Sequence, residues 1–441
     1  LAVLSRAAWV QVVRADETLT EASLTLQADG ARRYTYNPRL LAAARTIERG
    51  TILDRHGVPL ASSRLAELTK HKDTFAHLGI NLDEACPRES GRCYPFGGSL
   101  FHVIGDWNTQ RNWAASNTSF IERDVDRDLR GYDDGAKVIQ IANARTGVSQ
   151  ATIRRDYRAL VPLVRHRYEP DHPEVVALRQ GVRDVMTTID VRLQLRAART
   201  LERHIREHKY SRGAVVVMDP ASGDVLASVS YPWPSASREA AAANVEDDAK
   251  AQPLLDRARY GLYPPGSTFK LVTAMAALRQ DPSLAETEFT CRHLPDSRVG
   301  IQLPGWTRPI RDDELDKTPH GSVAMTHGLV VSCNAYFAQL GVRVGPQAIA
   351  DTAAMFQIAS AEPATPAELR KALPFASYGQ GEVLASPLRM AVVAGSIAAG
   401  GVIPQPTWVP VDPKVKKPQV RVLDKRLAAS LAGAMRQVVT S

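Results

Sequence analysis

Apolar residues recur at helical spacing just after residue 190. They fall at Leu193, Ala197, Leu201 and Ile205, which is the three-to-four-residue spacing of one helix face. Asp190 stands before the first of them, and aspartate is a residue type that caps the first turn of helices. The pattern therefore predicts an amphipathic helix that Asp190 caps.

Two apolar runs then flank a turn. Residues 214–218 and 225–229 are rich in valine and are separated by "DPASGD", which holds a proline and a glycine. This arrangement predicts a hairpin of two buried strands. A helix followed by such a hairpin indicates a sheet covered by helices.

Further apolar helices are predicted beyond the hairpin. "STFKLVTAMAALRQ" (267–280) is apolar on almost every side, so we expect it in the interior of a large domain. Residues 320–345 predict two helical pieces joined near the sequence Ser-Cys-Asn. The segments 384–401 and 424–439 predict two more helices, the first of which ends at a pair of glycines.

The first 180 residues are more polar and are broken by many turn signals. "RGTILDRHGVPLASS" (49–63) predicts a strand, a turn at "DRHG" and a second strand. The apolar residues within 64–165 follow no dominant helical or strand period, and residues 171–185 are interpreted as a connector. We therefore expect two modules, 1–180 and 181–441, in a chain whose 441 residues exceed one ordinary core.

Charge argues against a nucleic-acid partner. The net charge is +8, but the two signs are interspersed, as in "ERDVDRDLR" (122–130), and no basic run alternates with aromatic residues. The densest basic cluster, "KVKK" (414–417), is interpreted as a solvated loop. No run of 18 apolar residues occurs, so we expect no bilayer span inside the chain. Residues 1–13 fit either an amphipathic helix or the outer end of a membrane helix lying before residue 1.

The cysteines leave two interpretations open. Cys86 and Cys93 flank six residues that include a proline and a glycine. A disulfide there would contribute roughly 2–3 kcal/mol through loop closure and would need an oxidising compartment. Two free thiols fit the sequence equally well. No further Cys or His stands at zinc-site intervals, so we expect no metal and no cofactor.

"YPPGSTFK" (263–270) holds the most suggestive chemistry. The prolines and glycine stop the chain, and Ser267 and Lys270 then lie three residues apart, on one helix face. A lysine in an apolar helix is desolvated, which lowers its pKa and lets a neutral amine take the serine proton. The alternative is a helix start with a surface lysine.

"SCN" (332–334) is a second constellation. Residues i and i+2 of a non-helical link point to the same side, so the Ser332 hydroxyl and the Asn334 amide would face one cleft. They could relay a proton and hold a substrate amide. The alternative is a polar turn between two helices.

These segments together resemble the penicillin-binding protein transpeptidases. A nearly all-apolar helix opened by Ser-x-x-Lys, then Ser-x-Asn 65 residues beyond the first serine, is similar to that family's arrangement. "GLYPPGSTFK", "VVVMDPASGDVLA", "VVSCNAYFAQLG" and "YGQGEVLASPLRMA" resemble the family around those motifs. The two site motifs alone would also fit serine β-lactamases.

The amino-terminal part resembles the non-catalytic module of the monofunctional, class B branch. "RGTILDRHG" (49–57), "YPFGGSLFHVIG" (94–105) and "LRGYDD" (129–134) carry this likeness. The motif residues of the first segment are Arg49, Gly50, Asp54, Arg55 and Gly57. The resemblance implies a multidomain α+β fold. An extended, β-rich pedestal or dimerisation-like module would span 1–180, and a transpeptidase domain, an antiparallel sheet covered by helices with an all-helical subdomain, would span 181–441.

The resemblance also implies a mechanism. Ser267 would attack a D-alanyl-D-alanine carbonyl of a peptidoglycan stem peptide, with Lys270 as the base. Ser332 would pass a proton toward the leaving group, and Asn334 would bind the donor peptide. An amine of a neighbouring stem peptide would then release the acyl group and close a cross-link, and β-lactams would acylate the same serine.

One element of the family pattern is missing. No lysine of the chain is followed by Thr-Gly or Ser-Gly. "DKTPHG" (316–321) is not a substitute, because it precedes Ser332 and has a proline where the family has glycine. We expect the transpeptidase domain to be cut before the third motif, and we expect this piece alone to be inactive.

Partners and location follow from the family alone. The resemblance implies a bacterial cytoplasmic-membrane protein anchored before residue 1, with an extracytoplasmic catalytic domain and a multi-spanning glycan polymerase as partner. It does not decide between elongation, division and sporulation. The alternatives are a β-lactam-binding sensor, or a catalytically silent scaffold for such a polymerase.

Overall fold

The computed structural model describes residues 5–6, 9, 14–87, 91–105, 121–234, 251–412, 414–415 and 418–440. Contacts divide the chain into two compact units, Leu1–Arg192 and Leu193–Ser441. Residues 181–192, which we expected in the second module, belong to the first unit. Most of the stretch 1–13 lies outside the described residues. Among those described, no helix combines the length and apolar character that crossing a bilayer needs.

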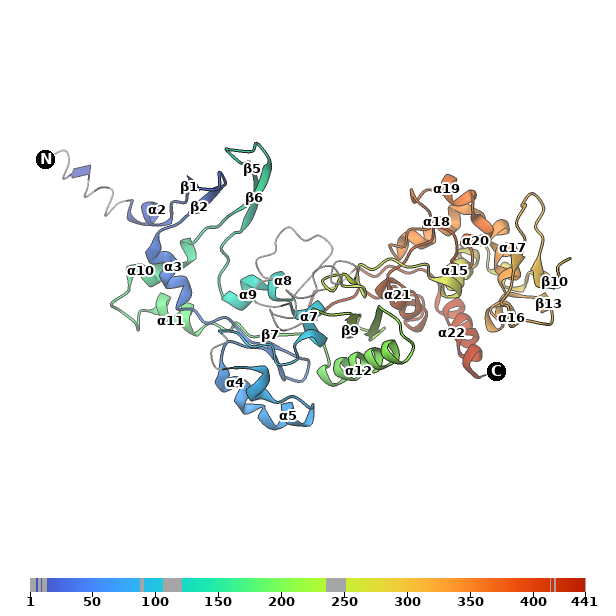
Figure 1. The fold of residues 1–441 in the computed structure, drawn as a ribbon, viewed down its shortest axis with the longest axis horizontal. Coiled ribbons are helices and arrows are strands. Elements are labelled where there is room, and N and C mark those ends of the chain that lie inside the picture. The colour runs from blue at the N-terminus through green and yellow to red at the C-terminus, as the bar shows by residue number, and fades with distance from the viewer. Residues whose placement is uncertain are drawn as a thin grey trace. The chain divides into compact units, whose positions relative to one another are not determined.

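The first unit mixes short helices with short strands (Figure 1). We expected this unit to be β-rich, but among its described residues more lie in helices than in strands. Its elements are α2 (Ala15–Thr20), β1 (Ser23–Leu26), β2 (Arg32–Thr35), α3 (Pro38–Arg45), β3 (Ile52–Leu53), β4 (Pro59–Ala61), α4 (Leu65–Lys70), α5 (Lys72–His77), α6 (Leu82–Ala85), α7 (Gly98–Ile104), α8 (Ile121–Asp124), α9 (Asp126–Arg130), β5 (Lys137–Ala142), β6 (Ser149–Arg154), η3 (Arg158–Leu160), α10 (Val161–Arg165), α11 (Pro173–Gln180) and β7 (Val185–Met186).

The segment that was interpreted as a connector is structured. Residues 171–185 contain α11 and the start of β7, so that interpretation is wrong. β7 pairs in parallel with β3, and β3 pairs antiparallel with β4 in the predicted strand–turn–strand. Strands of two or three residues are too short to show a period of two, which is why β7 was missed.

Arg49 is a buried residue of a charged cluster. Its guanidinium donates to Glu122 Oε2 at 2.8 Å and to Asp126 Oδ1 at 2.5 Å. Arg92 also binds Glu122, and Tyr94 donates to it at 3.1 Å. Glu122 is fully buried. The motif arginine, which precedes β3, therefore binds α8 and α9 through one carboxylate of each helix, and it shares the Glu122 carboxylate with Arg92.

The other motif residues shape the backbone around β3. A side chain at Gly50 would lie 1.9 Å from the carbonyl oxygen of Arg183, so only glycine fits there. Asp54 Oδ1 accepts bonds from the N–H groups two and four residues later, at 2.8 Å each. Arg55 donates its N–H to Ile189, and Gly57 closes the turn with φ +83°.

Cys86 and Cys93 are joined by a disulfide, with their Cα atoms 5.4 Å apart. The bond closes the loop between α6 and the strand-like bridge of Ser62 with Cys93. The backbone of Cys93 is thereby paired with the residue that follows β4.

The second unit holds the long apolar helices. Its elements are α12 (Val191–Glu207), which begins two residues before the unit boundary, β8 (Gly213–Met218), β9 (Val225–Tyr231), η4 (Gly266–Phe269), α15 (Lys270–Gln280), η5 (Pro282–Glu286), β10 (Phe289–His293), β11 (Val299–Ile301), β12 (Ile310–Arg311), β13 (Gly321–Val323), α16 (Met325–Val330), α17 (Asn334–Val344), α18 (Pro346–Met355), α19 (Pro366–Arg370), α20 (Leu373–Ala376), α21 (Pro387–Ala398) and α22 (Lys425–Thr440).

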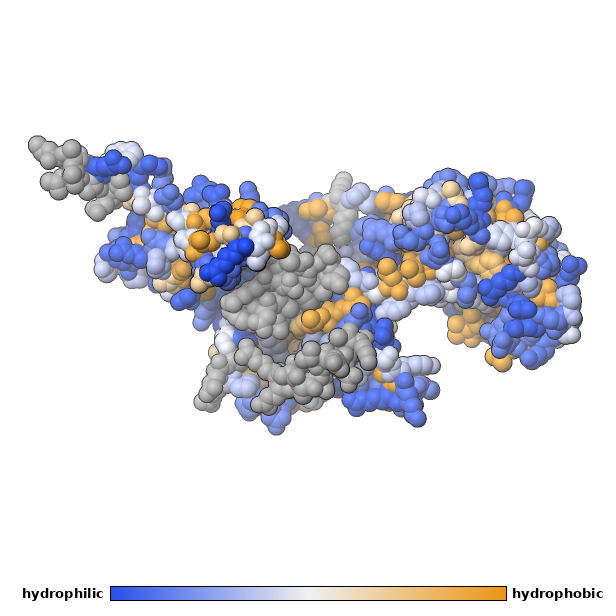
Figure 2. Space-filling model, turned by 45° about the horizontal axis from the view of Figure 1, so that its top comes forward, coloured by the Kyte–Doolittle hydropathy of each residue, from blue (hydrophilic) through white to orange (hydrophobic). Residues whose placement is uncertain are grey.

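α15 is the centre of this unit. It contacts α17, α18 and α21, and its residues from Val272 to Ala277 are fully buried, as its all-round apolar pattern predicted. On the face drawn in Figure 2, hydrophilic residues cover most of the described surface and apolar residues form small patches. The predicted helices at 191–207, 325–344, 387–398 and 425–440 are all present.

Two sheets accompany these helices. β8 and β9 form the predicted antiparallel hairpin, but only β9 is mostly buried, whereas β8 is half-buried along its whole length. A second, antiparallel sheet in the order β12-β11-β10-β13 was not predicted. α17 packs on it and contacts β10, β11 and β12. This sheet therefore supports the start of α17 from beneath.

Candidate active site

Ser267 lies exposed in a short 3-10 turn that leads into α15. We expected it in the first α-helical turn, but η4 occupies residues 266–269 and α15 begins at Lys270. In a 3-10 turn, residues three apart eclipse each other, which brings Ser267 directly over Lys270. Gly266 makes the approach with φ +57°.

In contrast to the exposed Ser267, Lys270 is buried, with only 1% of its surface exposed. Its Nζ lies 3.1 Å from Ser267 Oγ and 2.9 Å from Ser332 Oγ, and it also donates to the Ser332 carbonyl oxygen. The ring of Phe337 lies 5.8 Å from Nζ. The structure thus brings both serines to one buried amine.

Burial lowers the pKa of Lys270 to about 8. The negative charges of Asp312 and Asp316 act in the opposite direction and raise the pKa of Lys270, but they are weaker than desolvation. A pKa near 8 leaves part of the amine neutral at pH 7, so that its lone pair can accept the Ser267 proton.

Ser332 is held between two helices in an unusual conformation. The Ser332 N–H donates to Leu329 at 3.1 Å and the Cys333 N–H donates to Gly328 at 2.9 Å, which is the pattern of a Schellman motif closing α16. The residue at this position is usually glycine, yet Ser332 adopts φ +54°. A strained non-glycine residue of this kind is typical of functional sites.

Cys333 and Asn334 begin α17. Cys333 is fully buried and its Sγ accepts from Tyr336 N at 3.3 Å, whereas Ser332 is exposed. In the Ser-Cys-Asn link, the side chain of the middle residue, Cys333, therefore lies inside the protein, whereas that of Ser332 lies at the surface. The Asn334 side chain donates to the Arg311 carbonyl at 3.0 Å, so it is anchored to the end of β12.

Asp312 was not predicted from the sequence as a site residue, yet its carboxylate binds the backbone at the end of the Ser-Cys-Asn link. It follows β12, is buried, and its Oδ1 accepts from the N–H groups of Asn334 and Ala335. A carboxylate at the start of a helix satisfies donors that have no partner inside the helix. No spacing rule relates Asp312 to the Ser-Cys-Asn sequence, because the sheet brings them together.

The segment "YGQG" (378–381) supports the Ser267 turn. Gly266 N donates to Gly379 O at 3.0 Å, and a side chain at Gly379 would lie 2.1 Å from Gly266 O. Thr273 of α15 donates to the Ser377 carbonyl at 2.7 Å. Two stretches more than 100 residues apart are therefore in direct backbone contact beneath the candidate nucleophile.

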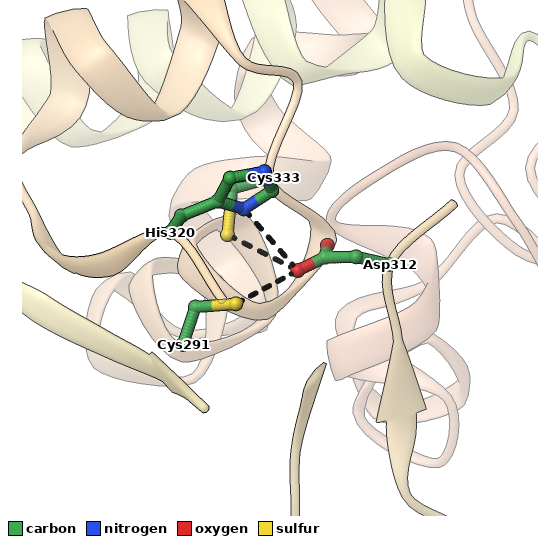
Figure 3. A group of neighbouring side chains, drawn as sticks. All are labelled: Cys291, Asp312, His320 and Cys333. Atoms are coloured by element: carbon green, nitrogen blue, oxygen red, sulfur yellow. Dashed lines mark hydrogen bonds and ion pairs between the residues drawn. The ribbon is translucent and has the colours of Figure 1, made fainter. Parts of the chain in front are cut away.

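One mostly buried cluster could hold a metal ion, although we expected none from the sequence. Cys291, Asp312, His320 and Cys333 place their ligand atoms within 4.8 Å of one another (Figure 3). The four residues are scattered over 43 positions, without the paired spacing of zinc motifs, so the sequence did not indicate them.

Comparison with known proteins decides the family. The profile described as penicillin binding protein transpeptidase domain matches residues 213–441, which is more than half of the chain. The chain belongs to this family. Its curated relatives place it in the class B branch of penicillin-binding proteins.

Two relatives illustrate the likeness of this penicillin-binding protein. Peptidoglycan D,D-transpeptidase PbpA of Mycobacterium tuberculosis is 33% identical over 219 residues, which are 45% of this chain and 43% of the relative. Peptidoglycan D,D-transpeptidase MrdA of Acinetobacter baumannii is 29% identical over 302 residues, 65% of this chain and 38% of the relative. The chain thus matches less than half the length of these curated relatives.

Solved structures share the fold over most of the chain. Penicillin-binding protein A from M. tuberculosis, as a ceftriaxone acyl-enzyme complex, aligns with a TM-score of 0.62 and 24% identity, covering 91% of this chain and 82% of that one. PBP2 of Pseudomonas aeruginosa aligns with a TM-score of 0.53 and 21% identity, covering 89% and 80%. The multidomain α+β architecture is therefore that of penicillin-binding proteins.

Proposed function

We propose that this protein is a peptidoglycan D,D-transpeptidase that works through a Ser267 acyl-enzyme and is inhibited by β-lactams. One observation carries the proposal: the exposed Ser267 hydroxyl lies 3.1 Å from a buried lysine amine that also reaches Ser332. This is an activated nucleophile with a second hydroxyl positioned for proton transfer.

The acylation step follows from these positions. The Ser267 proton passes to the neutral Lys270 amine while Oγ forms a bond to the carbonyl carbon of the penultimate D-alanine. The bond to the terminal D-alanine breaks, and its nitrogen receives a proton through Ser332. The N–H of Ser267, in the first turn of η4, stabilises the developing oxyanion.

Deacylation reverses the roles of the same groups. An amine of a neighbouring stem peptide attacks the acyl-enzyme, gives up a proton through Ser332 and Lys270, and releases Ser267. Asn334, anchored at the end of β12, binds the backbone of the donor peptide. A β-lactam opens its ring by the same attack. Penicillin-binding protein A of M. tuberculosis is known as acyl-enzyme complexes with ceftriaxone, imipenem and penicillin G, which supports this part of the proposal.

We assign the first unit to a pedestal role outside the cytoplasm, with a membrane-embedded glycan polymerase as partner. The disulfide of Cys86 and Cys93 supports an oxidising compartment. The buried ion pairs around Glu122 support a rigid module. A test is cross-linking from the surface of this unit in cells, where capture of no membrane protein would contradict the partner.

The function is tested with a labelled penicillin on the full-length protein. We expect covalent labelling of the wild type and none of Ser267→Ala. Ser283→Ala, a substitution of an exposed serine in η5, is the matched control and should label like the wild type. Labelling that survives Ser267→Ala would refute the nucleophile, and an unlabelled wild type would favour a silent scaffold. Cross-linking of a donor stem peptide to an acceptor amine then separates a transpeptidase from a sensor.

A further inference from the structure

A short loop of the sheet β10–β13 forms a defined turn near the candidate active site. Residues 302–309 connect β11 to β12. The Trp306 N–H donates to the Leu303 carbonyl at 3.2 Å, and the Gln302 side chain donates to the Trp306 carbonyl. Gly305 has φ +79°, so the Pro-Gly pair of this loop forms a turn in which glycine takes the left-handed position. The residues that follow the turn therefore start from a fixed backbone.

Three aromatic side chains meet at this loop, and we call them the aromatic cluster. The ring centre of Trp306 lies 6.4 Å from that of Phe375, and the ring centre of Phe375 lies 6.3 Å from that of Tyr378. Trp306 and Phe375 are half-buried, whereas Tyr378 is buried. Part of the aromatic cluster is therefore accessible to a ligand.

Arg308 lies over the aromatic cluster. The carbon of its guanidinium is 5.3 Å from the centre of the Phe375 ring, within the range of a cation–π contact. Burial raises the pKa of Tyr378 to about 12, and the positive charge of Arg308 acts in the opposite direction. The guanidinium therefore also lies within electrostatic reach of the Tyr378 hydroxyl. A side chain that is already held on a ring loses less conformational entropy when it binds a ligand.

The charge of Arg308 is not balanced inside the part of the chain that the structure describes. Two arginines near it in the sequence are paired: Arg298, just before β11, lies 2.9 Å from Glu314, and Arg311, in β12, lies 2.8 Å from Asp296. Arg308 is exposed and forms no such ion pair with a described carboxylate. A guanidinium that is held in place but not neutralised is suited to bind an anionic group of a ligand.

Two connections place Arg308 and the aromatic cluster at the edge of the candidate active site. The Arg311 carbonyl, three residues after Arg308, accepts the Asn334 amide at 3.0 Å. The aromatic cluster ends in the segment 378–381, which contacts the backbone of the Ser267 turn. Two aromatic rings lie between Arg308 and that turn, so the group that Arg308 binds is not the one that reacts. The ligand that fits is an anionic group elsewhere on the same peptide.

We propose that Arg308, held on the aromatic cluster, binds a carboxylate of the donor stem peptide outside its reacting D-alanyl-D-alanine end and so selects the donor. This inference rests on the proposed function. The guanidinium donates two parallel N–H bonds to the carboxylate oxygens, as in other bidentate arginine pairs. Trp306 packs against the aliphatic part of the same substrate residue. A stem peptide with an amide in place of this carboxylate is therefore a poorer donor.

Competition with labelled benzylpenicillin tests this recognition on the full-length protein. Two synthetic stem peptides ending in D-alanyl-D-alanine are compared, one with a free carboxylate on the preceding residue and one with that carboxylate converted to an amide. We expect the carboxylate peptide to block labelling of the wild type at a concentration about tenfold lower than the amide peptide, because charge-assisted hydrogen bonds are the stronger ones. Equal competition by the two peptides, or competition by neither, would overturn the proposal.

Substitutions of Arg308 separate its charge from its shape. Arg308→Ala should make the two peptides compete equally, and Arg308→Glu should reverse the preference. Arg308→Lys should keep a preference of only about threefold, because an ammonium group cannot form the bidentate pair. Arg370→Ala, which replaces an exposed arginine at the end of α19, is the matched control and should keep the full preference. Circular dichroism checks that each variant remains folded.

A cross-linking assay decides whether the carboxylate belongs to the donor or to the acceptor peptide. The amide peptide serves as donor, and an acceptor that lacks the D-alanyl-D-alanine end is supplied with a free or an amidated carboxylate. Arg308→Ala should leave transfer to both acceptors unchanged. A loss of transfer confined to the acceptor with the free carboxylate would overturn the assignment to the donor.

Labelling in the absence of peptide separates this inference from the proposed function. Benzylpenicillin has no carboxylate at the position of the residue before D-alanyl-D-alanine, so every Arg308 variant should label at the wild-type rate. Slower labelling of Arg308→Ala would mean that Arg308 binds the carboxylate at the reacting end, which would contradict the proposal. If the wild type labels but does not discriminate between the two peptides, only this inference fails. If the wild type does not label at all, the proposed function fails with it.

Discussion

Lys270 combines two requirements that oppose each other. Its amine must be desolvated to be a base near neutral pH, and desolvation of an ammonium destabilises the folded protein. With 1% of its surface exposed, its pKa is lowered to about 8 from an ordinary value of 10.5. The base of the proposed reaction is therefore also a source of instability.

The first prediction concerns the pH dependence of labelling. Since only the neutral amine accepts a proton, the second-order rate of penicillin acylation should rise about tenfold per pH unit well below pH 8 and level off above it. Stopped-flow measurement from pH 6 to 10 checks this, with Ser283→Ala as a control that should follow the same curve. A flat profile between pH 6 and 9 would exclude Lys270 as the base.

The second prediction is that Lys270→Met stabilises the protein while abolishing labelling. The folded pKa of about 8 lies below the unfolded one, so the penalty is fully present below pH 8 and disappears as the pH rises from 8 to 10.5. The penalty corresponds to about 3 kcal/mol, reduced by the lost hydrogen bonds, so a gain of about 1–3 kcal/mol is expected at pH 7.

Urea unfolding at pH 7 and at pH 10.5 measures this gain, which should shrink at the higher pH. Lys371→Met, which replaces an exposed lysine paired with Glu368 at 2.7 Å, should change stability by less than about 1 kcal/mol at either pH. A destabilised Lys270→Met protein would contradict the argument.

At the scale of elements, the site depends on the contact between the η4 turn and the segment 378–381. Gly379 has φ +78° and no room for a side chain, since Cβ would lie 2.1 Å from Gly266 O. Gly381 has a similar φ of +72° but open space, with its nearest neighbour, Ala372 Cβ, 3.7 Å away. Substitutions at Gly379 and Gly381 therefore separate the cost of a positive φ, which both share, from the cost of a steric clash, which only Gly379 has.

We predict that Gly379→Ala costs more than about 3 kcal/mol and lowers the labelling rate at least 100-fold, because the new methyl displaces the Ser267 turn. Gly381→Ala should cost only about 1–2 kcal/mol, the penalty of a left-handed conformation, and should label nearly normally. Thermal unfolding and labelling rates measure both effects. Equal losses in the two variants would mean that the close contact with Gly266 has no special importance.

At the scale of the molecule, the two units differ in what stabilises them. The second unit has a large apolar core around α15. In the first, the charged cluster of Arg49, Arg92, Glu122 and Asp126 is buried among short elements. Removal of one member of such a cluster leaves unpaired buried charges, which typically costs 3–5 kcal/mol.

We therefore predict that Glu122→Ala destabilises the first unit by about 3–5 kcal/mol and leaves labelling of Ser267 unchanged below its melting temperature. Glu67→Ala, which removes an exposed ion pair with Lys70, should cost less than about 1 kcal/mol. Limited proteolysis followed by labelling measures the two units separately. Loss of labelling in the intact Glu122→Ala protein would show that the units do not act independently.

Local patterns in the sequence determined the long elements and the reactive pair. The apolar spacing predicted α12, α17, α21 and α22, because helices of this length repeat their period several times. Ser267 and Lys270 could be paired from sequence because three residues span one turn, and that distance is fixed by backbone geometry. The change in composition near residue 180 also predicted two modules, and contacts divide the chain into two units at residue 192.

Only the tertiary structure shows which elements and residues support the reactive pair of Ser267 and Lys270. The sheet of β10–β13 has strands of two to five residues, too short for a readable period, and α11 and β7 were mistaken for a connector. Asp312, Gly379 and His320 acquire their importance only from neighbours far away in the chain. Spacing along the sequence constrains residues within a turn or a hairpin, whereas contacts over tens of residues depend on how the helices and sheet pack.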